Sequence, residues 1–340
     1  MAKKEKGIFG ILTESIGLYF SNFDKFFKYM SFPVLGQIAG LVLIFLTTYF
    51  YTINMPKLID KYPDLNNLGT LVGISVVIAL PGLAIFCKAF WDFLVAYGAI
   101  NSMLENMLKS GRVYDFAAHN ELIKRRTIPF IGLWLLYSIF FALAACPLLW
   151  VPAGIFVVYF VLVFQVFTFE PELSPVGCAK KSLALVKGHF RDTFILLFLI
   201  GVLTYSIIPH IVTAACNGIG ITTGLSNAIM PFVNLLPELH LEQFGFKILH
   251  SDMASVTVNV VIAQIFIQYT LPLRSILWSM WYKELNGSIP QPEYNTKITK
   301  KKRTSKRPSE KLMEESRKKF SKEKLDDNII RRAMEKDDEE

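Results

Sequence analysis

The sequence has few residues of the kinds that metal and redox sites require. Only four cysteines are present, and they include no CxxC pair and have no histidine at zinc-binding spacing. The five histidines are scattered along the chain. We therefore expect no metal site and no cofactor.

Recognisable catalytic groupings are also missing. The segment GIGITTG, residues 218–224, has the glycines of a phosphate loop but lacks the Gly-Lys-Ser/Thr ending of a P-loop. Paired carboxylates and nucleophile–base pairs do not occur at usable spacing in the sequence. The sequence thus predicts a protein that is not an enzyme.

Charged residues make up only 19% of the 340 residues, whereas 52% are hydrophobic. A helix that spans a membrane needs roughly 20 apolar residues. Six runs meet this requirement, with the third and fourth divided at Cys146–Pro147: 30–53, 71–95, 128–146, 148–169, 193–215 and 255–280. We expect an all-α, polytopic membrane helix bundle with about six transmembrane helices and interfacial amphipathic helices, in a domain that covers residues 1–285.

The positive charges predict how this bundle is oriented. Most Lys and Arg residues lie before the first run, in the loops 100–127 and 170–191, or after the last run. Because positive charge stays on the cytoplasmic side, both termini should be cytoplasmic. Cys146 and Cys216 would then lie near the outer face, where a disulfide between them is a further hypothesis.

The stretch KKSLALVKGHFRDTF, residues 180–194, combines a basic row with an apolar row. On a helical wheel, three cations, Lys180, Lys187 and Arg191, border an apolar stripe. The members of the stripe are Ala179, Leu183, Val186, Phe190 and Phe194. This layout is typical of a helix that lies in the membrane interface and reaches phosphates with its cationic stems. We expect these cations to contact lipid headgroups; simple anchoring is the alternative.

A similar stretch, SIGLYFSNFDKFF at residues 15–27, precedes the first run. Aligning the two stretches with an offset of 167 residues pairs Ser15 with Ser182 and Phe23 with Phe190. Each stretch stands directly before a membrane entry. The sequence therefore predicts a duplicated unit, an interfacial helix followed by a hairpin.

The segment 286–340 differs from the rest in composition. Apolar residues become rare, and a basic cluster contains Lys300, Lys301, Lys302 and Arg303. We expect a charged, largely disordered cytoplasmic tail whose cations contact anionic headgroups. Nucleic acid is not expected as a partner, because no aromatic residues for base stacking interleave the cluster.

Polar residues within the runs are candidates for an intramembrane site. Lys88 and Asp92 share a helix face at a spacing of four, as do Gln264 and Gln268. A substrate path is one interpretation of these four residues. Snorkelling of the charged pair and hydrogen bonds between helices are the alternative.

The runs SPVGCAKKSLALVKGHFRDTF (174–194) and LPLRSILWSMWYKEL (271–285) resemble a broad bacterial family of six-helix inner-membrane proteins. That family includes the membrane domain of some glycerophosphoryl diester phosphodiesterases and related membrane proteins of unknown function. The resemblance implies a six-helix topology in a bacterial inner membrane but no activity, since the catalytic barrel of the fused enzymes has no counterpart in this chain.

These observations favour a non-catalytic membrane role, such as envelope organisation or interaction with lipids or with membrane or envelope proteins. A transporter of a small or lipidic substrate is the second hypothesis, and it predicts a cavity that reaches Gln264, Gln268 or Lys88. An intramembrane enzyme is the weakest of the three.

Overall fold

A computed structural model of the chain describes residues 7–113, 115–144, 146–235, 239–241 and 246–287. The chain divides into two compact units, Met1–Pro290 and Gln291–Glu340. The described residues all belong to the first unit, and the predicted tail from 288 onward lies outside them.

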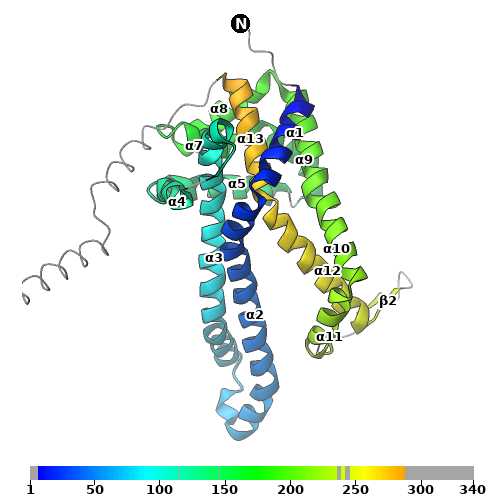
Figure 1. Ribbon diagram of the computed structural model, residues 1–340. Helices are drawn as coiled ribbons and strands as arrows, with labels where there is room; N and C mark the ends of the chain where they lie inside the picture. Colours follow the sequence, from blue (N-terminus) through cyan, green and yellow to red (C-terminus); the bar gives the residue numbers. More distant parts are fainter. Residues whose placement is uncertain (1–6, 114, 145, 236–238, 242–245, 288–340) are drawn as a thin grey trace, which may run out of the picture. The chain divides into compact units, whose positions relative to one another are not determined.

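The described part of the first unit is built almost entirely of helices (Figure 1), as the sequence predicts. The helices in chain order are α1 (Ile8–Ser21), α2 (Phe23–Lys61), η1 (Pro63–Leu65), α3 (Leu68–Ser110), α4 (Phe116–Lys124), α5 (Thr127–Ala144), η2 (Pro147–Leu149), α6 (Trp150–Phe160), α7 (Val163–Phe169), α8 (Pro175–Lys187), α9 (Phe190–Gly201), the π-helix η3 (Val202–Ile207), α10 (Ile208–Gly218), α11 (Ile221–Val233), α12 (His250–Tyr269) and α13 (Leu271–Asn286). A short antiparallel hairpin, β1 (Leu239–Leu241) and β2 (Phe246–Ile248), pairs His240 with Lys247.

Five helical stretches are long and apolar enough to cross a membrane: Phe23–Lys61, Leu68–Ser110, Pro147–Phe169, Phe190–Gly218 and His250–Asn286. They coincide with five of the six predicted runs, and the chain is a multi-pass membrane protein. The third predicted run falls on α5, whose described apolar part, Thr127–Ile139, is shorter. A sixth crossing at α5 therefore stays a prediction.

The two longest helices, α2 and α3, pack against each other as a hairpin (Figure 1). At 1.5 Å per residue, their 39 and 43 residues extend for about 60 Å, roughly twice the hydrocarbon thickness of a bilayer. The helices touch at Gly40, where a Cβ atom would lie 2.6 Å from the Phe86 amide nitrogen and 2.8 Å from the Gly82 carbonyl oxygen. Glycine is required there because two backbones occupy the space of a side chain.

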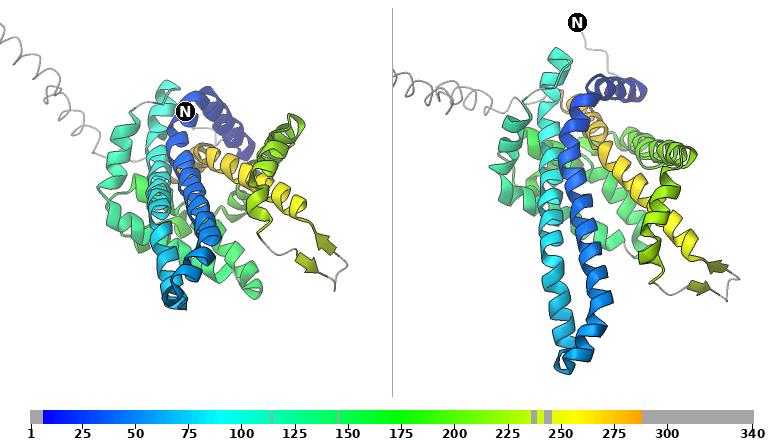
Figure 2. Two further views of the ribbon diagram at one scale, coloured as in Figure 1. Left: turned by 90° about the horizontal axis from the view of Figure 1, so that it is seen from below. Right: turned by 60° about the horizontal axis from the view of Figure 1, so that its bottom comes forward.

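Helix α13 lies at the centre of the core and is buried on all sides. Its buried residues are Leu271, Pro272, Leu273, Ser275, Ile276, Leu277, Trp278, Ser279, Met280, Trp281 and Tyr282. It packs against α1, α3, α7 and α8, and Figure 2 gives two further views of this arrangement. The core thus gathers at one end of the α2–α3 hairpin, where α3 contributes Leu94 to Met107.

The sixth predicted run, 255–280, lies within the candidate span His250–Asn286, but a break at Thr270 divides it into two helices. The chain forms α12 up to Tyr269 and α13 from Leu271, because Pro272 has no amide hydrogen with which to continue the first helix. The two halves have different surroundings. Val256 and Val260 of α12 are exposed, whereas α13 is enclosed by protein.

The structure brings out the predicted duplication in detail. The residues that α1 buries, Ile11, Ser15 and Tyr19, align at the offset of 167 with buried residues of α8. These counterparts are Cys178, Ser182 and Val186. Phe23 and Phe190 are each the first residue of the next helix, and the residues before them share one backbone conformation: φ −123° and ψ 19° at Asn22, φ −129° and ψ 28° at His189. The two stretches are therefore structurally equivalent helix-to-helix junctions.

The close approach of α2 and α3 can be tested with alanine. We expect Gly40→Ala to force the helices apart and to lower the stability of the detergent-solubilised protein by about 1–3 kcal/mol. Gly73→Ala on α3 is the matched control, because a Cβ there meets nothing within 4 Å. Thermal unfolding of both variants checks the prediction, and equal stability of the two would contradict it.

Candidate functional site

The cationic stretch forms α8, a two-residue junction and the start of α9. The Ser174 hydroxyl oxygen accepts a hydrogen bond from the Gly177 amide at 3.2 Å, and Pro175 occupies the first turn of α8. The helix stops at Lys187, and Gly188 and His189 lead into α9 at Phe190. The stretch is thus not one continuous helix.

The predicted apolar stripe does not lie on one lipid-facing side. Ala179 and Val186 are buried against the protein core, whereas Leu183 is 40% exposed. Helix α8 does have an apolar face, but it packs against α5, α6 and α7. The prediction of a stripe that enters the headgroup boundary is corrected accordingly.

The predicted cations occupy the outward side of the junction. Lys180, Lys187 and Arg191 are all exposed. On α8 the two lysines alternate with Val176 and Leu183, which are also exposed. Lys181 differs, because it is partly buried and its Nζ lies 3.7 Å from Glu170 Oε1.

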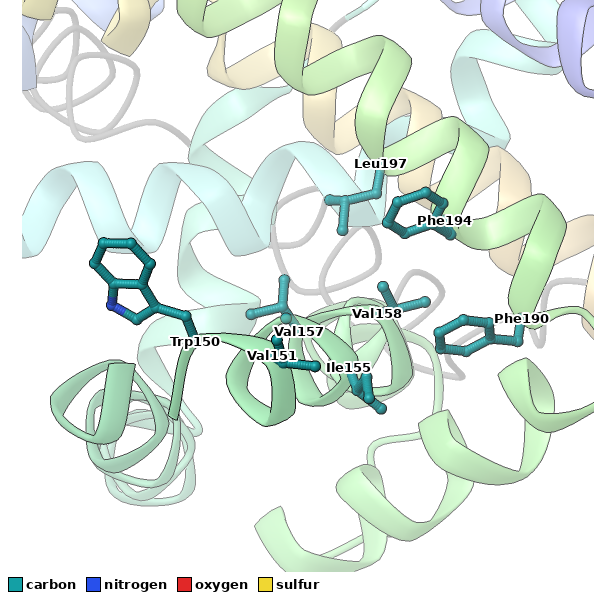
Figure 3. A pocket seen from close by; sticks show the side chains of 9 residues that line it. Trp150, Val151, Ile155, Val157, Val158, Phe190, Phe194 and Leu197 are labelled. Atoms are coloured by element: carbon teal, nitrogen blue, oxygen red, sulfur yellow. The ribbon is translucent and has the colours of Figure 1, made fainter. Parts of the chain in front are cut away.

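An apolar pocket of about 530 Å³ lies beside this junction, between α6 and α9 (Figure 3). Its α6 wall is formed by residues between Trp150 and Val158, and its α9 wall by Phe190, Phe194 and Leu197. Hydrocarbon makes up nearly all of the lining, and the pocket is partly open. We call it the α6–α9 groove.

Two contacts join the junction to α6 next to the groove. The Ser182 hydroxyl donates to the Tyr159 carbonyl oxygen at 2.8 Å, and the Tyr159 ring lies 5.1 Å from that of Phe190. The cations of the junction and the α6 wall of the groove therefore lie on helices that contact each other directly.

The duplicated junction between α1 and α2 lacks these cations. At the offset of 167, Phe20 stands in the place of Lys187 and Asp24 in the place of Arg191. The copies thus bury the same positions, share a serine at one of them (Ser15 and Ser182), and differ in their outward charge.

Lys88 and Asp92 form an ion pair on α3, as their spacing predicts. The Lys88 side chain is 66% exposed and that of Asp92 16%. The pair therefore lies on the outside of the α2–α3 hairpin, where the long lysine stem can reach an interface.

Gln264 and Gln268 lie on α12, the first exposed and the second partly buried. The Gln268 Oε1 atom is buried without a hydrogen-bond partner among the described residues. None of the four predicted intramembrane residues lines the α6–α9 groove.

The buried polar residues gather elsewhere, around Asn101 of α3. Its Oδ1 atom accepts hydrogen bonds from the Ser275 hydroxyl, from the Ser279 hydroxyl at 3.2 Å and from Gln165 Nε2 at 3.3 Å. Gln165 also donates to the Tyr97 hydroxyl at 3.3 Å. One oxygen thus joins α3, α7 and α13.

Arg274 lies in the first turn of α13. It donates to the Tyr205 hydroxyl and, at 3.0 Å, to the Ile267 carbonyl oxygen, and its Cζ atom lies 4.7 Å from the centre of the Tyr205 ring. The guanidinium group therefore caps the end of α12 at the proline break and ties it to η3.

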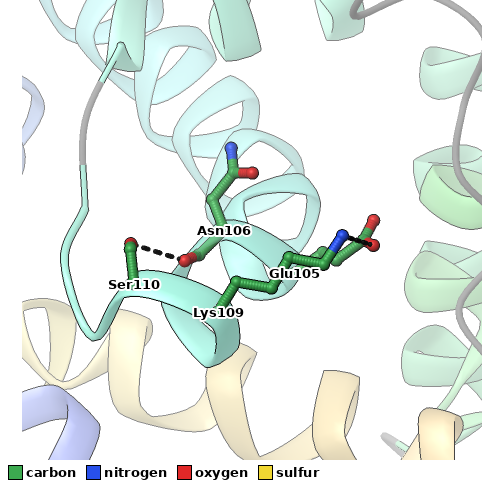
Figure 4. Close-up of polar contacts among 4 residues, drawn as sticks. All are labelled: Glu105, Asn106, Lys109 and Ser110. Atoms are coloured by element: carbon green, nitrogen blue, oxygen red, sulfur yellow. Dashed lines mark hydrogen bonds and ion pairs between the residues drawn. The ribbon is translucent and has the colours of Figure 1, made fainter.

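A serine–histidine pair, also missed in the sequence, lies near the end of α3. Ser102 Oγ and His119 Nδ1 are 2.6 Å apart, and burial lowers the pKa of His119 while Asp115 opposes this shift. The Asp115 carboxylate accepts from the Ala118 amide as a helix cap. Figure 4 shows the adjoining end of α3, where Lys109 pairs with Glu105 at 2.6 Å and Ser110 donates to the Asn106 carbonyl oxygen.

All four cysteines are free thiols. Cys87 and Cys146 are exposed, Cys216 is partly buried, and Cys178 is buried on α8. Burial raises the pKa of Cys178 to about 11, which makes it a poor nucleophile. The disulfide between Cys146 and Cys216 is not formed here.

The other predicted contacts with lipid headgroups lie outside the described residues: Lys300, Lys301, Lys302 and Arg303. Within the described ranges, no group of three or more His, Cys, Asp or Glu residues could hold a metal ion. No family model, curated protein or solved structure matches the chain. The resemblance to the phosphodiesterase membrane domains therefore stays a prediction.

The Asn101 cluster can be tested by removing its shared acceptor. We expect Asn101→Leu to lower the stability of the solubilised protein by about 2 kcal/mol, because buried donors lose their partner. Adding Ser275→Ala and Ser279→Ala should restore part of the loss, since removing both sides leaves fewer unpaired groups. Asn106→Leu on the same helix is the control. A triple variant no more stable than Asn101→Leu in thermal unfolding would contradict this account.

Proposed function

We propose that this protein is a non-catalytic, multi-pass protein of a bacterial inner membrane that binds anionic phospholipids at its cytoplasmic face. The observation that carries the proposal is the outward placement of Lys180, Lys187 and Arg191 at one helix junction beside exposed apolar side chains.

Physical chemistry supports lipid as the partner of this junction. A cation close to an anionic membrane surface contributes about 1 kcal/mol, and a neighbouring apolar side chain can enter the headgroup boundary. The polybasic residues 300–303 would add to the same attraction. In this view, the first copy of the junction serves for packing and the second for lipid contact.

Both termini on the cytoplasmic side require an even number of crossings. Five stretches qualify by length and composition, and one of them contains α6. Helix α5, which precedes α6, would supply the sixth crossing. The outer loop 54–70 then carries only Lys57 and Lys61, in keeping with the rule that positive charge stays inside.

The polar pair at Ser102 supports a non-catalytic role. His119 is 4% exposed, and Asp115, the nearest carboxylate that acts on it, caps a helix. A hydrolytic triad needs a carboxylate that orients the histidine and a nucleophile that substrate can reach. The pair is better explained as a contact that fixes α4 to α3.

The second hypothesis is a transporter of a small or lipidic substrate. It would require a path to Lys88, Gln264 or Gln268, and the α6–α9 groove contains none of them. A role in envelope organisation through partner proteins is compatible with lipid binding and shares its surface.

The lipid proposal predicts a charge-dependent lipid composition. We expect the purified full chain to carry more phosphatidylglycerol and cardiolipin, relative to phosphatidylethanolamine, than the membrane from which it is extracted. Replacing Lys180, Lys187 and Arg191 by Gln should lower this enrichment at least about fivefold. Lys57→Gln with Lys61→Gln, on the opposite loop, is the control. Mass spectrometry of co-purified lipid measures the ratio, and unchanged enrichment in the triple variant would contradict the proposal.

The topology predicts which cysteines react from outside. In spheroplasts, a membrane-impermeant maleimide should label Cys146 in a variant that keeps only this cysteine. Ser110→Cys, in a cysteine-free background, should react only after permeabilisation, because the exposed end of α3 would face the cytoplasm. Labelling of Cys146 only after permeabilisation would show that α5 does not cross.

A further inference from the structure

We propose that the α6–α9 groove holds one acyl chain of an anionic glycerophospholipid whose phosphate contacts Arg191. The inference rests on the proposed lipid function and names the binding site and the part of the lipid that occupies it.

The lining of the groove suits a hydrocarbon chain. The α6 wall from Trp150 to Val158 runs for about 12 Å at 1.5 Å per residue, and Phe190, Phe194 and Leu197 face it. A polar ligand would lose its hydrogen bonds to water there without replacement, whereas an acyl chain has no polar group to satisfy. The volume of about 530 Å³ falls within the range of small-ligand sites.

The size of the groove argues against a protein occupant. A helix with its side chains is about 10–12 Å across, so it would have to separate α6 from α9. Tyr159 prevents this separation by contacting both Ser182 and Phe190 at one end. A flexible, narrow chain fits without such movement.

The position of Arg191 indicates where the anionic headgroup would bind. It precedes Phe194 by three residues, so the two side chains are neighbours on one flank of α9. Lys187 is a second exposed cation at the same junction, and Asp192 is less exposed than Arg191. The phosphate would also meet the positive end of α9, where the N-cap His189 makes no side-chain hydrogen bond.

The first copy of the junction strengthens the assignment. It has Phe20 and Asp24 where the second copy has Lys187 and Arg191. At these two positions, cations that could meet an anionic lipid therefore occur in the second copy alone, although Lys25 of the first copy stands in the place of Asp192.

Gly154 allows a test that fills the groove without disturbing the fold. It lines the groove, and a Cβ atom there meets nothing within 4 Å. We expect Gly154→Leu in the full chain to lower several-fold the fraction of protein that retains phosphatidylglycerol in native mass spectrometry. Gly17→Leu on α1 is the matched control, since its Cβ also meets nothing within 4 Å. Arg191→Gln should keep a bound phospholipid but lower the preference for phosphatidylglycerol over phosphatidylethanolamine about fivefold.

The outcomes separate the site from the function. If Gly154→Leu retains phosphatidylglycerol as the control does, while the triple charge variant loses it, the groove is not the site and the lipid function stands. If neither variant changes the bound lipid, both proposals fail. Loss of lipid from Gly154→Leu with unchanged thermal stability supports the groove.

Discussion

The arrangement of the helices depends on how one buried oxygen, Asn101 Oδ1, is satisfied. Two helices, α7 and α13, must present donors to this oxygen of α3 at the same point, so the three helices are fixed in register relative to one another. Apolar packing alone would allow these helices to slide, because hydrocarbon contacts have no preferred direction. In a membrane, where lipid tails are as apolar as leucine, a shared polar group supplies the specificity that hydrophobic burial cannot. The enclosed position of α13 follows from this constraint.

Around that centre, two equivalent junctions differ in their outward charge. Both place a buried serine toward the core, where Ser15 contacts Met280 and Ser182 contacts the Tyr159 carbonyl oxygen. The other aligned buried residues differ, Ile11 from Cys178 and Tyr19 from Val186, so the serine is what the two copies share on their inward side. The cations at Lys187 and Arg191 are therefore the features that connect the fold to the proposed lipid function.

Hydropathy predicted the membrane class and five of the stretches, since the cost of exposing polar backbone in lipid leaves few alternatives to long apolar helices. The repeat was visible as well, because Ser15 and Ser182 stand at equal distances from Phe23 and Phe190. Asn101 was missed because the second run was ended at residue 95 and the following residues were assigned to a loop, although α3 continues to Ser110. The break before Pro272 was missed because the apolar run continues without interruption on both sides of it. The groove could not be predicted at all, since it arises from helices that are distant in sequence and only meet in three dimensions.

The core holds the α2–α3 hairpin at one end through residues from Leu94 to Met107, whereas few side chains in the apolar stretch of α3 are buried. Farther along, Tyr49 of α2 contacts Phe232 of α11, with 4.4 Å between the ring centres. Two helices that are much longer than the hydrocarbon layer can adapt to a change in bilayer thickness by tilting. Since the glycine contact at Gly40 keeps the two helices together, they would tilt as one body. The hairpin thus couples the thickness of the surrounding membrane mechanically to the packed end of the protein.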